Sequence, residues 1–395
     1  MNVLIDKFLP RRDWLNQLKW RGSWSVVGNP IPNTLFARQS YDFSNGTIST
    51  RPPLFDDPQP ETTTSFETGL DVWMFENKFN FDLTYYNSTL RNQFLYVTTA
   101  NGESKPVNTG KIRNYGLEFQ ASYRWNINKD WRWQTGFNIA WNDNRILETY
   151  KTESGAPYEV QMGPNAFKIK YVEGGRYGDI YVNSFARDEN GHIKINDAGN
   201  YENAVPVMAS GKYETKVGNM TSPVTLGWNN TFTWKNFTLY FLIDGRIGGK
   251  VMSLTEADLD LYGLSERSAQ DRLNGERVMQ NGKEYILKPL PDGSGNKVSV
   301  ENYYTTIGAL PMEDHVYNAT SLRMRDISLS YDMPNLFGKN QGMTAQFSVK
   351  NAFFIYKDSP VDPDISVSAA NGYSGIDCYS LPTTRSFALT LKFNF

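Results

Sequence analysis

The last eleven residues, Arg385-Ser-Phe-Ala-Leu-Thr-Leu-Lys-Phe-Asn-Phe395, alternate strictly between two kinds of side chain. Apolar residues occupy every second position: Phe387, Leu389, Leu391, Phe393 and Phe395. The intervening positions carry Ser386, Ala388, Thr390, Lys392 and Asn394. Successive side chains of a strand point to opposite faces, so this segment predicts a β-strand with one apolar and one polar face. A chain that ends on an aromatic residue inside such a strand is typical of the closing strand of an outer-membrane β-barrel.

The composition agrees with a barrel. The chain has 395 residues, of which 14% are aromatic and only 39% hydrophobic, and its mean hydropathy is -0.52. A barrel needs this combination, because alternate residues face lipid and water and aromatic rings gather at both membrane interfaces. A soluble β-sandwich can share the composition, so the arrangement of strands and connections has to separate the two.

Period-two segments recur along the whole chain and predict about ten antiparallel strands. They cover residues 18–26, 66–74, 79–86, 114–125, 131–142, 224–234, 237–244, 322–331, 347–349 and 385–395. Leu322 and Met324 are out of phase with Ile327 and Leu329, which predicts a β-bulge near 325–326.

The connections between these strands alternate in length. Residues 76–77, 126–130, 235–236 and 334–342 are short connections, and residues 29–62, 89–111, 143–221, 248–318 and 357–384 are long ones. Short periplasmic turns and long extracellular loops alternate in this way in transmembrane barrels, whereas a soluble sandwich has no reason to sort its loops. The fold class predicted is therefore all-β, an antiparallel transmembrane β-barrel portion with the C-terminus on the periplasmic side.

Aromatic residues flank the short turns and predict an inner membrane girdle. The residues are Trp73, Phe75, Phe79, Trp125, Trp131, Trp133, Trp234 and Phe237.

Several function classes find no support in the sequence. The net charge of -2 does not indicate nucleic-acid binding. Cys378 is the single cysteine, so the chain can form neither an internal disulfide nor a CxxC metal or redox site. His192 is explained as a turn residue, and His315, beside two acidic residues, is the one weak candidate for catalysis of the omptin kind. We expect the acidic pairs Asp258/Asp260 and Asp362/Asp364 to be solvated loop residues rather than a Ca²⁺ site. No catalytic residue, metal or cofactor is expected.

Six sequence islands resemble one family when taken in order. They are Leu18-Lys-Trp-Arg-Gly-Ser-Trp24, Ser65-Phe-Glu-Thr-Gly-Leu-Asp71, Asn114-Tyr-Gly-Leu-Glu118, Arg323-Met-Arg-Asp-Ile-Ser-Leu-Ser-Tyr331, Lys350-Asn-Ala-Phe353 with Asp362-Pro-Asp364, and Gly375-Ile-Asp377 with Pro382. Their order and spacing resemble the C-terminal part of a SusC/RagA-type TonB-linked outer-membrane transporter of Bacteroidetes. Ala352 and Asp364 depart from the usual Leu and Glu of that pattern.

This resemblance implies a function and partners. It implies active import of oligosaccharides by a SusCD-like complex, with peptide import as the alternative, a SusD-like surface lipoprotein as partner, and TonB as the source of energy. Residues 1–395 would then form about ten strands of a 22-stranded type of barrel. A signal peptide, TonB box, plug and N-terminal domain are not visible in the sequence, so we expect an open, curved sheet with a wide concave polar face.

Candidate ligand contacts follow from the predicted positions of polar and aromatic side chains. The inward-facing charged set is Glu67, Asp71, Asp82, Glu118, Arg124, Arg132 and Asp244. Most of these are expected to form ion pairs on the lumen wall, and tyrosines of the long loops are expected mainly to pack the loops. From both sets, the residues selected as candidate substrate contacts are Tyr177, Tyr181, Tyr303, Tyr304, Arg132 and Glu118.

Overall fold

The computed structural model describes residues 1–8, 12–30, 40–44, 47–51, 59–98, 104–108, 110–152, 155–162, 167–211, 213–309, 313–339, 341–364 and 375–394. Its main feature is an eleven-stranded sheet in which every neighbouring pair is antiparallel. The order is β1 (Asn2–Leu4), β2 (Leu15–Asn29), β5 (Glu61–Met74), β6 (Phe79–Arg91), β9 (Lys111–Asn126), β10 (Trp131–Glu148), β17 (Val224–Trp234), β18 (Phe237–Ile247), β24 (Ser321–Gly338), β25 (Gln341–Lys357) and β27 (Ser386–Asn394). The all-β prediction is confirmed.

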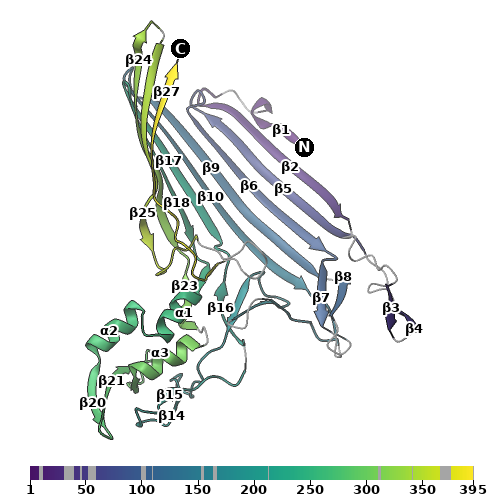
Figure 1. Cartoon of the computed structure of the whole chain (residues 1–395). Helices are drawn as coiled ribbons and strands as arrows, with labels where there is room; N and C mark the ends of the chain where they lie inside the picture. Colours follow the sequence, from purple (N-terminus) through teal and green to yellow (C-terminus); the bar gives the residue numbers. More distant parts are fainter. Residues whose placement is uncertain are drawn as a thin grey trace.

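The sheet forms a curved, open wall (Figure 1). β1 and β27 are the ends of the strand order and are not paired with each other. The first strand predicted from the sequence, at residues 18–26, is not the edge of the sheet. Asn2, Val3 and Leu4 add a short strand that pairs with Arg21, Trp20 and Lys19.

The ladder register places apolar residues next to one another on a single face. Phe137 of β10 lies between Ala121 of β9 and Trp228 of β17, and Ile139 lies between Phe119 and Leu226. Between them along the strands lie Gln120, Asn138 and Gly227, so a one-residue slip of register would turn polar side chains toward the apolar face. The predicted bulge is also confirmed, because Ile243 and Leu242 pair with Met324 and Asp326, so that Arg325 is skipped.

The short and long connections lie at opposite ends of the wall (Figure 1). The turns after β5, β9 and β17 are short, as expected, and occupy residues 75–78, 127–130 and 235–236. The expected connection 334–342 is mostly strand instead, because β24 runs to Gly338 and β25 starts at Gln341. The register is interrupted between Met333 and Gly338, where Pro334 has no N–H to donate to the ladder.

The long connections contain small sheets and helices that the sequence analysis did not predict. Two hairpins are formed by β3 (Ser40–Ser44) with β4 (Thr47–Arg51) and by β7 (Phe94–Thr98) with β8 (Ser104–Asn108). The remaining small sheets contain β11 (Val160–Met162), β12 (Lys168–Tyr171), β13 (Asp179–Val182) and β16 (Thr215–Asn219); β14 (Ile195–Asn196) and β15 (Val205–Pro206); β19 (Lys250–Ser253), β23 (Val316–Asn318) and β26 (Ile376–Asp377); and β20 (Glu276–Gln280), β21 (Lys283–Pro289) and β22 (Lys297–Ser299).

Helices accompany these sheets. They are the α-helices α1 (Leu254–Leu261), α2 (Glu266–Asn274) and α3 (Val300–Ala309), and the 3₁₀ turns η1 (Ile5–Phe8) and η2 (Glu313–His315). Among the described residues, none of the helices is long and apolar enough to cross a lipid bilayer.

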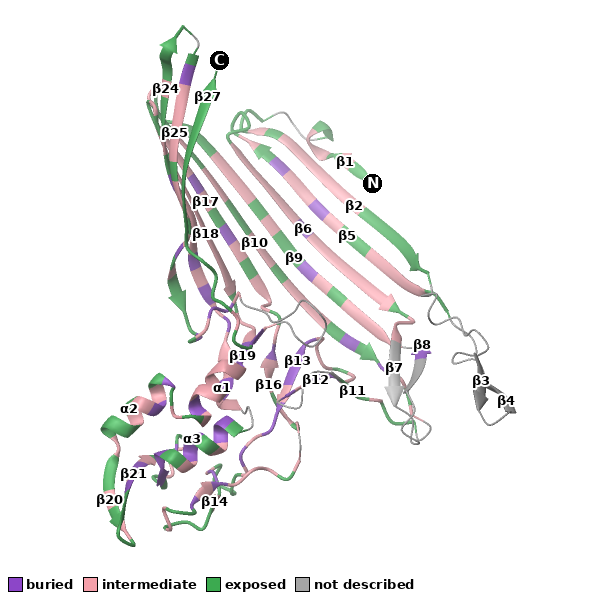
Figure 2. Cartoon of the chain, viewed as in Figure 1, coloured by how far each residue is buried: buried purple, intermediate pink, exposed green. Residues whose placement is uncertain are grey.

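Fully buried residues are concentrated in the loop region rather than in the wall (Figure 2). One hydrophobic core is built around α3 and includes Phe185, Val298 and Ile307. A second lies where β12, β13 and β19 meet the wall and includes Phe167 and Met252. The loops therefore have cores of their own, which hold their polar surfaces in fixed positions at one end of the sheet.

Candidate functional site

The inner, polar face of the wall carries a first ion-pair network on β2, β5 and β6. Asp71 lies 2.9 Å from both Lys19 Nζ and Arg21 Nε. Arg21 also binds Asp82 and donates to Thr84 Oγ1 at 3.0 Å. Asp71 and Asp82 are directly opposite each other in the ladder, so the two cations separate like charges that would otherwise destabilise the pair.

A second network ties a loop to the wall at β18 and β24. Arg323 Nη2 donates to Asp362 Oδ1 at 2.6 Å, and Arg325 Nη2 donates to Asp364 Oδ2 at 2.7 Å. Arg246 binds Asp364 as well. Burial raises the pKa of Asp362, but hydrogen bonds from Thr383 and Arg323 outweigh it and hold that pKa below its ordinary value. The carboxylates are therefore ionised and fix the segment 362–364 against the strands.

The expectation that these acidic pairs are solvated is wrong for Asp362 and Asp260. Asp362 is buried against Arg323, and Asp260 is completely buried in the loop region. Asp260 binds Arg267, accepts from Ser265 Oγ at 2.5 Å, and lies 2.8 Å from His315 Nε2. Arg323 is 39 residues from Asp362 and His315 is 55 residues from Asp260, so the sequence gives no local signal for these two contacts.

His315 is likewise not an exposed catalytic candidate. Its side chain is 0% exposed and joins η2 to α1 and α2 through Asp260 and Arg267. Because the ring is completely buried, a substrate has no access to it in this structure. His192 lies in a turn in which Asp188 Oδ1 accepts from the backbone N–H groups of Asn190 and His192, as the turn interpretation predicts.

The six candidate substrate contacts fall in different places. Tyr303 and Tyr304 of α3 are each 3% exposed, and their hydroxyls donate to Asp314 and Asp271. Burial is the main cause that raises the pKa of both hydroxyls. These two rings pack the loop core, which is the role expected of most loop tyrosines.

The other four candidates remain accessible at least in part. Tyr177 is stacked on Tyr171 with ring centroids 4.7 Å apart, and Tyr181 lies under Lys170 at 5.1 Å. Glu118 and Arg132 are exposed on the inner face of β9 and β10. The structure does not bring the six together into one site.

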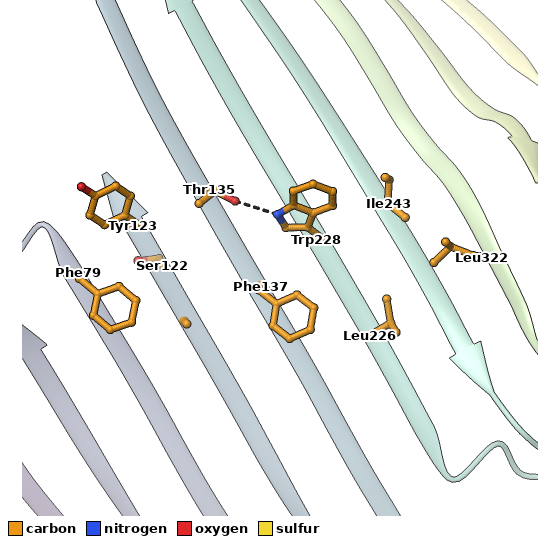
Figure 3. A pocket seen from close by; sticks show the side chains of 10 residues that line it. Phe79, Ser122, Tyr123, Thr135, Phe137, Leu226, Trp228, Ile243 and Leu322 are labelled. Carbon is orange, nitrogen blue, oxygen red and sulfur yellow. Dashed lines mark hydrogen bonds between the residues drawn. The ribbon is translucent and has the colours of Figure 1, made fainter. Parts of the chain in front are cut away.

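Two grooves follow the two faces of the wall. On the inner face, a groove of about 950 Å³ at the short-turn end is lined by polar and basic residues, including Arg124, Lys129 and Arg132. On the outer face, a groove of about 490 Å³ is lined mainly by apolar side chains around Phe137 and Trp228 (Figure 3). The indole N–H of Trp228 donates to Thr135 Oγ1 at 2.9 Å, so this indole donor is not left unpaired toward lipid.

Aromatic rings form a continuous row at the short-turn end of the outer face. Trp131 stacks on Trp234, Trp234 on Phe237, and Phe237 contacts Tyr331, with centroids 5.6, 6.1 and 4.5 Å apart. All four rings are exposed and come from adjacent strands β10, β17, β18 and β24. An exposed apolar band bordered by such a row is the surface of a wall that lies in a membrane. The fold and its surfaces define part of an outer-membrane β-barrel.

Comparison with known proteins identifies the family. Residues 7–352 match the family described as "TonB dependent receptor-like, beta-barrel", and the chain belongs to this family. It is 23% identical to TonB-dependent receptor P3 of Formosa agariphila, over 100% of this chain and 41% of the relative. It is 25% identical to TonB-dependent receptor SusC of Bacteroides thetaiotaomicron, over 99% of this chain and 39% of the relative.

Solved structures show the same fold. The RagAB peptide importer in its open-open state is matched with a TM-score of 0.71 and 18% identity, over 100% of this chain and 42% of that chain. Another structure of the RagAB peptide transporter is matched with a TM-score of 0.69 and 17% identity, over 100% of this chain and 43% of that chain. The chain therefore spans about two fifths of the length of these relatives. The SusC/RagA resemblance is confirmed, and the protein is an outer-membrane protein of a receptor and transporter family rather than a hydrolase of the omptin kind.

Proposed function

We propose that residues 1–395 form the C-terminal portion of the barrel wall of an importer that takes up oligosaccharides across the outer membrane. The observation that supports the proposal is a combination of three features. One face of the wall is apolar and faces lipid, and the inner face is polar. The loops at the long-connection end of the wall have hydrophobic cores of their own. A transport wall needs all three features. The lipid face holds it in the bilayer, the inner face solvates the pathway, and ordered loops present a binding surface.

The partners in this proposal follow from the family. A SusD-like lipoprotein would cover the loop end, and TonB would supply energy through parts of the protein that the present chain does not contain. The loop cores support the first point, because a rigid loop surface loses less conformational entropy on docking than a flexible one.

Growth and binding assays on the full-length protein that carries this segment test the proposal. Deletion of its gene should abolish growth on the imported oligosaccharide and leave growth on monosaccharides unchanged. Shortening the connection 143–221, which contributes Tyr177 and Tyr181, should impair uptake while the protein still reaches the outer membrane. If growth on peptides is lost instead, the substrate class is peptide and the oligosaccharide proposal fails.

A further inference from the structure

Two arginines lie directly opposite each other at the long-connection end of the wall. Arg113 of β9 and Arg145 of β10 are ladder partners, and like charges in this position destabilise a strand pair. Leu117 and Trp141, the partners four residues nearer the short turn, are exposed on the outer, apolar face. Side chains alternate along a strand, so Arg113 and Arg145 are on the outer face as well.

The residues next to the two arginines agree with this orientation. Ile112 and Ile146 are also ladder partners, and both pack in the loop core that contains Phe167 and Met252. That core covers one face of the wall at this end, and the arginines are on the other face. The side chain of Arg145 is 47% exposed.

The depth of the arginine pair in the membrane follows from the strand geometry. Trp131 belongs to the aromatic row at the short-turn end, and Trp141 is ten residues further along β10. At about 3.4 Å per residue and a tilt of about 40°, the two indoles are about 26 Å apart along the membrane normal, which matches an apolar band of about 25 Å. Arg145 lies about 10 Å beyond Trp141, at the level of the lipid headgroups.

The described residues supply little negative charge to the arginine pair. Asp143 Oδ2 is 3.8 Å from Arg145 Nε, but Oδ1 of the same carboxylate is already 2.6 Å from Arg176 Nε. Arg113 has no carboxylate partner among the described residues, and its Nε donates to Asn87 Oδ1 at 3.1 Å. One carboxylate therefore serves a group of three arginines.

Neighbouring cations do not reduce this excess of positive charge. Lys111 is paired with Glu148 Oε1 at 3.1 Å and adds no net charge. Arg91 of β6, the ladder partner of Lys111, is exposed and adds a further positive charge. The inner-face networks differ, because Lys19 and Arg21 are paired there with carboxylates.

The guanidinium group of Arg113 is held in place by aromatic and polar contacts. Its Cζ lies 4.9 Å from the centroid of the Tyr115 ring, in a cation–π contact. The Tyr115 hydroxyl in turn donates to Asp143 Oδ2 at 3.0 Å. A guanidinium group presents a planar set of donors that binds phosphate oxygens in pairs, so a fixed guanidinium is well suited to a phosphate group.

We propose that Arg113 and Arg145 bind the phosphate group of an anionic lipid headgroup, in the leaflet at the long-connection end of the wall. The excess positive charge requires an anion. The site continues the lipid-facing surface beyond Trp141 and lies on the face opposite to the transport pathway, so this anion belongs to a membrane lipid. The proposal rests on the assignment of the sheet as a barrel wall and is independent of which nutrient is imported.

Native mass spectrometry of the full-length protein in detergent tests this proposal. The protein is titrated with phosphatidic acid, with phosphatidylcholine of the same acyl chains, and with inorganic phosphate. Phosphatidic acid should bind at least tenfold more tightly than phosphatidylcholine. Arg113→Gln with Arg145→Gln should weaken the binding of one phosphatidic acid molecule at least tenfold and leave phosphatidylcholine binding unchanged.

The matched control is Lys350→Gln with Lys392→Gln. These lysines are exposed on the inner face, and neither has a carboxylate partner among the described residues. The control removes the same charge and should leave phosphatidic acid binding unchanged. If heat-modifiability shows that the double arginine variant does not assemble, Arg145→Gln alone, which changes an exposed side chain, should weaken binding at least threefold.

Three results would overturn the proposal. They are unchanged phosphatidic acid binding in the assembled arginine variant, equal weakening in the lysine control, and displacement of the lipid by inorganic phosphate at an equal concentration, which would define a site for a free anion. Because the readout is lipid binding rather than growth, failure here is distinguishable from failure of the proposed transport function.

Discussion

Arg323 Nη2 donates to Asp362 Oδ1 at 2.6 Å, and the two side chains are only 3% and 5% exposed. The pair joins a strand of the wall to the loop that precedes the closing strand. Arg323 also lies 3.9 Å above the ring of Phe354, so its charge is enclosed on two sides. The position of this loop is therefore set by buried electrostatics, which is sensitive to loss of either partner.

Loss of Asp362 should release the loop from the wall. Asp362→Ala leaves the Arg323 charge buried and unpaired, at a cost of about 3–5 kcal/mol. The backbone amides of Ile376 and Asp377 in the full-length protein should therefore exchange hydrogen faster, by the factor that corresponds to this loss of free energy. Lys357→Ala is the control, because Lys357 is exposed and has no carboxylate partner among the described residues; its Nζ donates to the Pro360 carbonyl. Equal exchange in both variants would contradict this role of the ion pair.

The cluster around Asp260 should make the loop region sensitive to acid. Burial raises the pKa of Asp260, but hydrogen bonds from His315, Arg267 and Ser265 outweigh this and leave the pKa below its ordinary value of 3.8. A carboxyl group whose pKa is lower in the folded state than in the unfolded state stabilises the fold at any pH above the unfolded-state pKa. This stabilisation is lost as the pH falls from the unfolded-state pKa through the folded-state pKa.

Protection of α1 and α2 amides, corrected for intrinsic exchange rates, should therefore fall between about pH 5 and pH 2. Asp260→Asn should lower protection at neutral pH and flatten this dependence, whereas Glu189→Gln, in an exposed turn, should leave it unchanged. A wild-type pH profile retained in Asp260→Asn would show that another group is responsible.

His315→Ala should act on stability and not on chemistry. The substitution removes one of the three side-chain partners of the buried Asp260 and should destabilise the loop region by about 1–3 kcal/mol. Thermal unfolding of the purified full-length protein measures this effect. A peptidase or lipase activity that depends on His315 would contradict the proposed role of the protein as an importer.

The terminal aromatic residue should matter for assembly. Phe395 lies outside the described residues, but Phe387 and Phe393 of the same strand contact Phe347 and Phe337. Phe395→Asp, or its removal, should lower the amount of parent protein in the outer membrane, measured by heat-modifiability on gels. Unchanged levels would show that the terminal ring is not part of an assembly signal.

The wall could be predicted from the sequence, because its strands obey one local rule. Period-two alternation located the ten longer strands, and even the bulge at Arg325 was visible as a change of phase. The short β1 escaped notice because three residues are too few to show a period. The end of β24 was predicted too early, before Pro334. A proline at a position where the register is interrupted does not have to end a strand.

The loop structure was harder to predict, because it depends on contacts between distant residues. Local signals for the helices were present. Ser253 accepts from the N–H of Glu256, and Ser265 from that of Ser268, as N-caps of α1 and α2. Nothing local indicates that Tyr303 is buried or that Asp260 meets Arg267 and His315. Candidate contacts chosen by residue type alone were therefore scattered over the inner wall and the loops.

The central claim is that the apolar face of the strands contacts lipid, and paired arginine substitutions test it most directly. Leu117 and Leu239 lie on the outer face, and Gln120 lies on the inner face. An arginine on the lipid side at mid-strand should cost about 2–4 kcal/mol. Leu117→Arg and Leu239→Arg should therefore strongly reduce heat-modifiable full-length protein in the outer membrane, while Gln120→Arg should leave it near wild-type levels. Equal tolerance of the outward and inward substitutions would contradict the account.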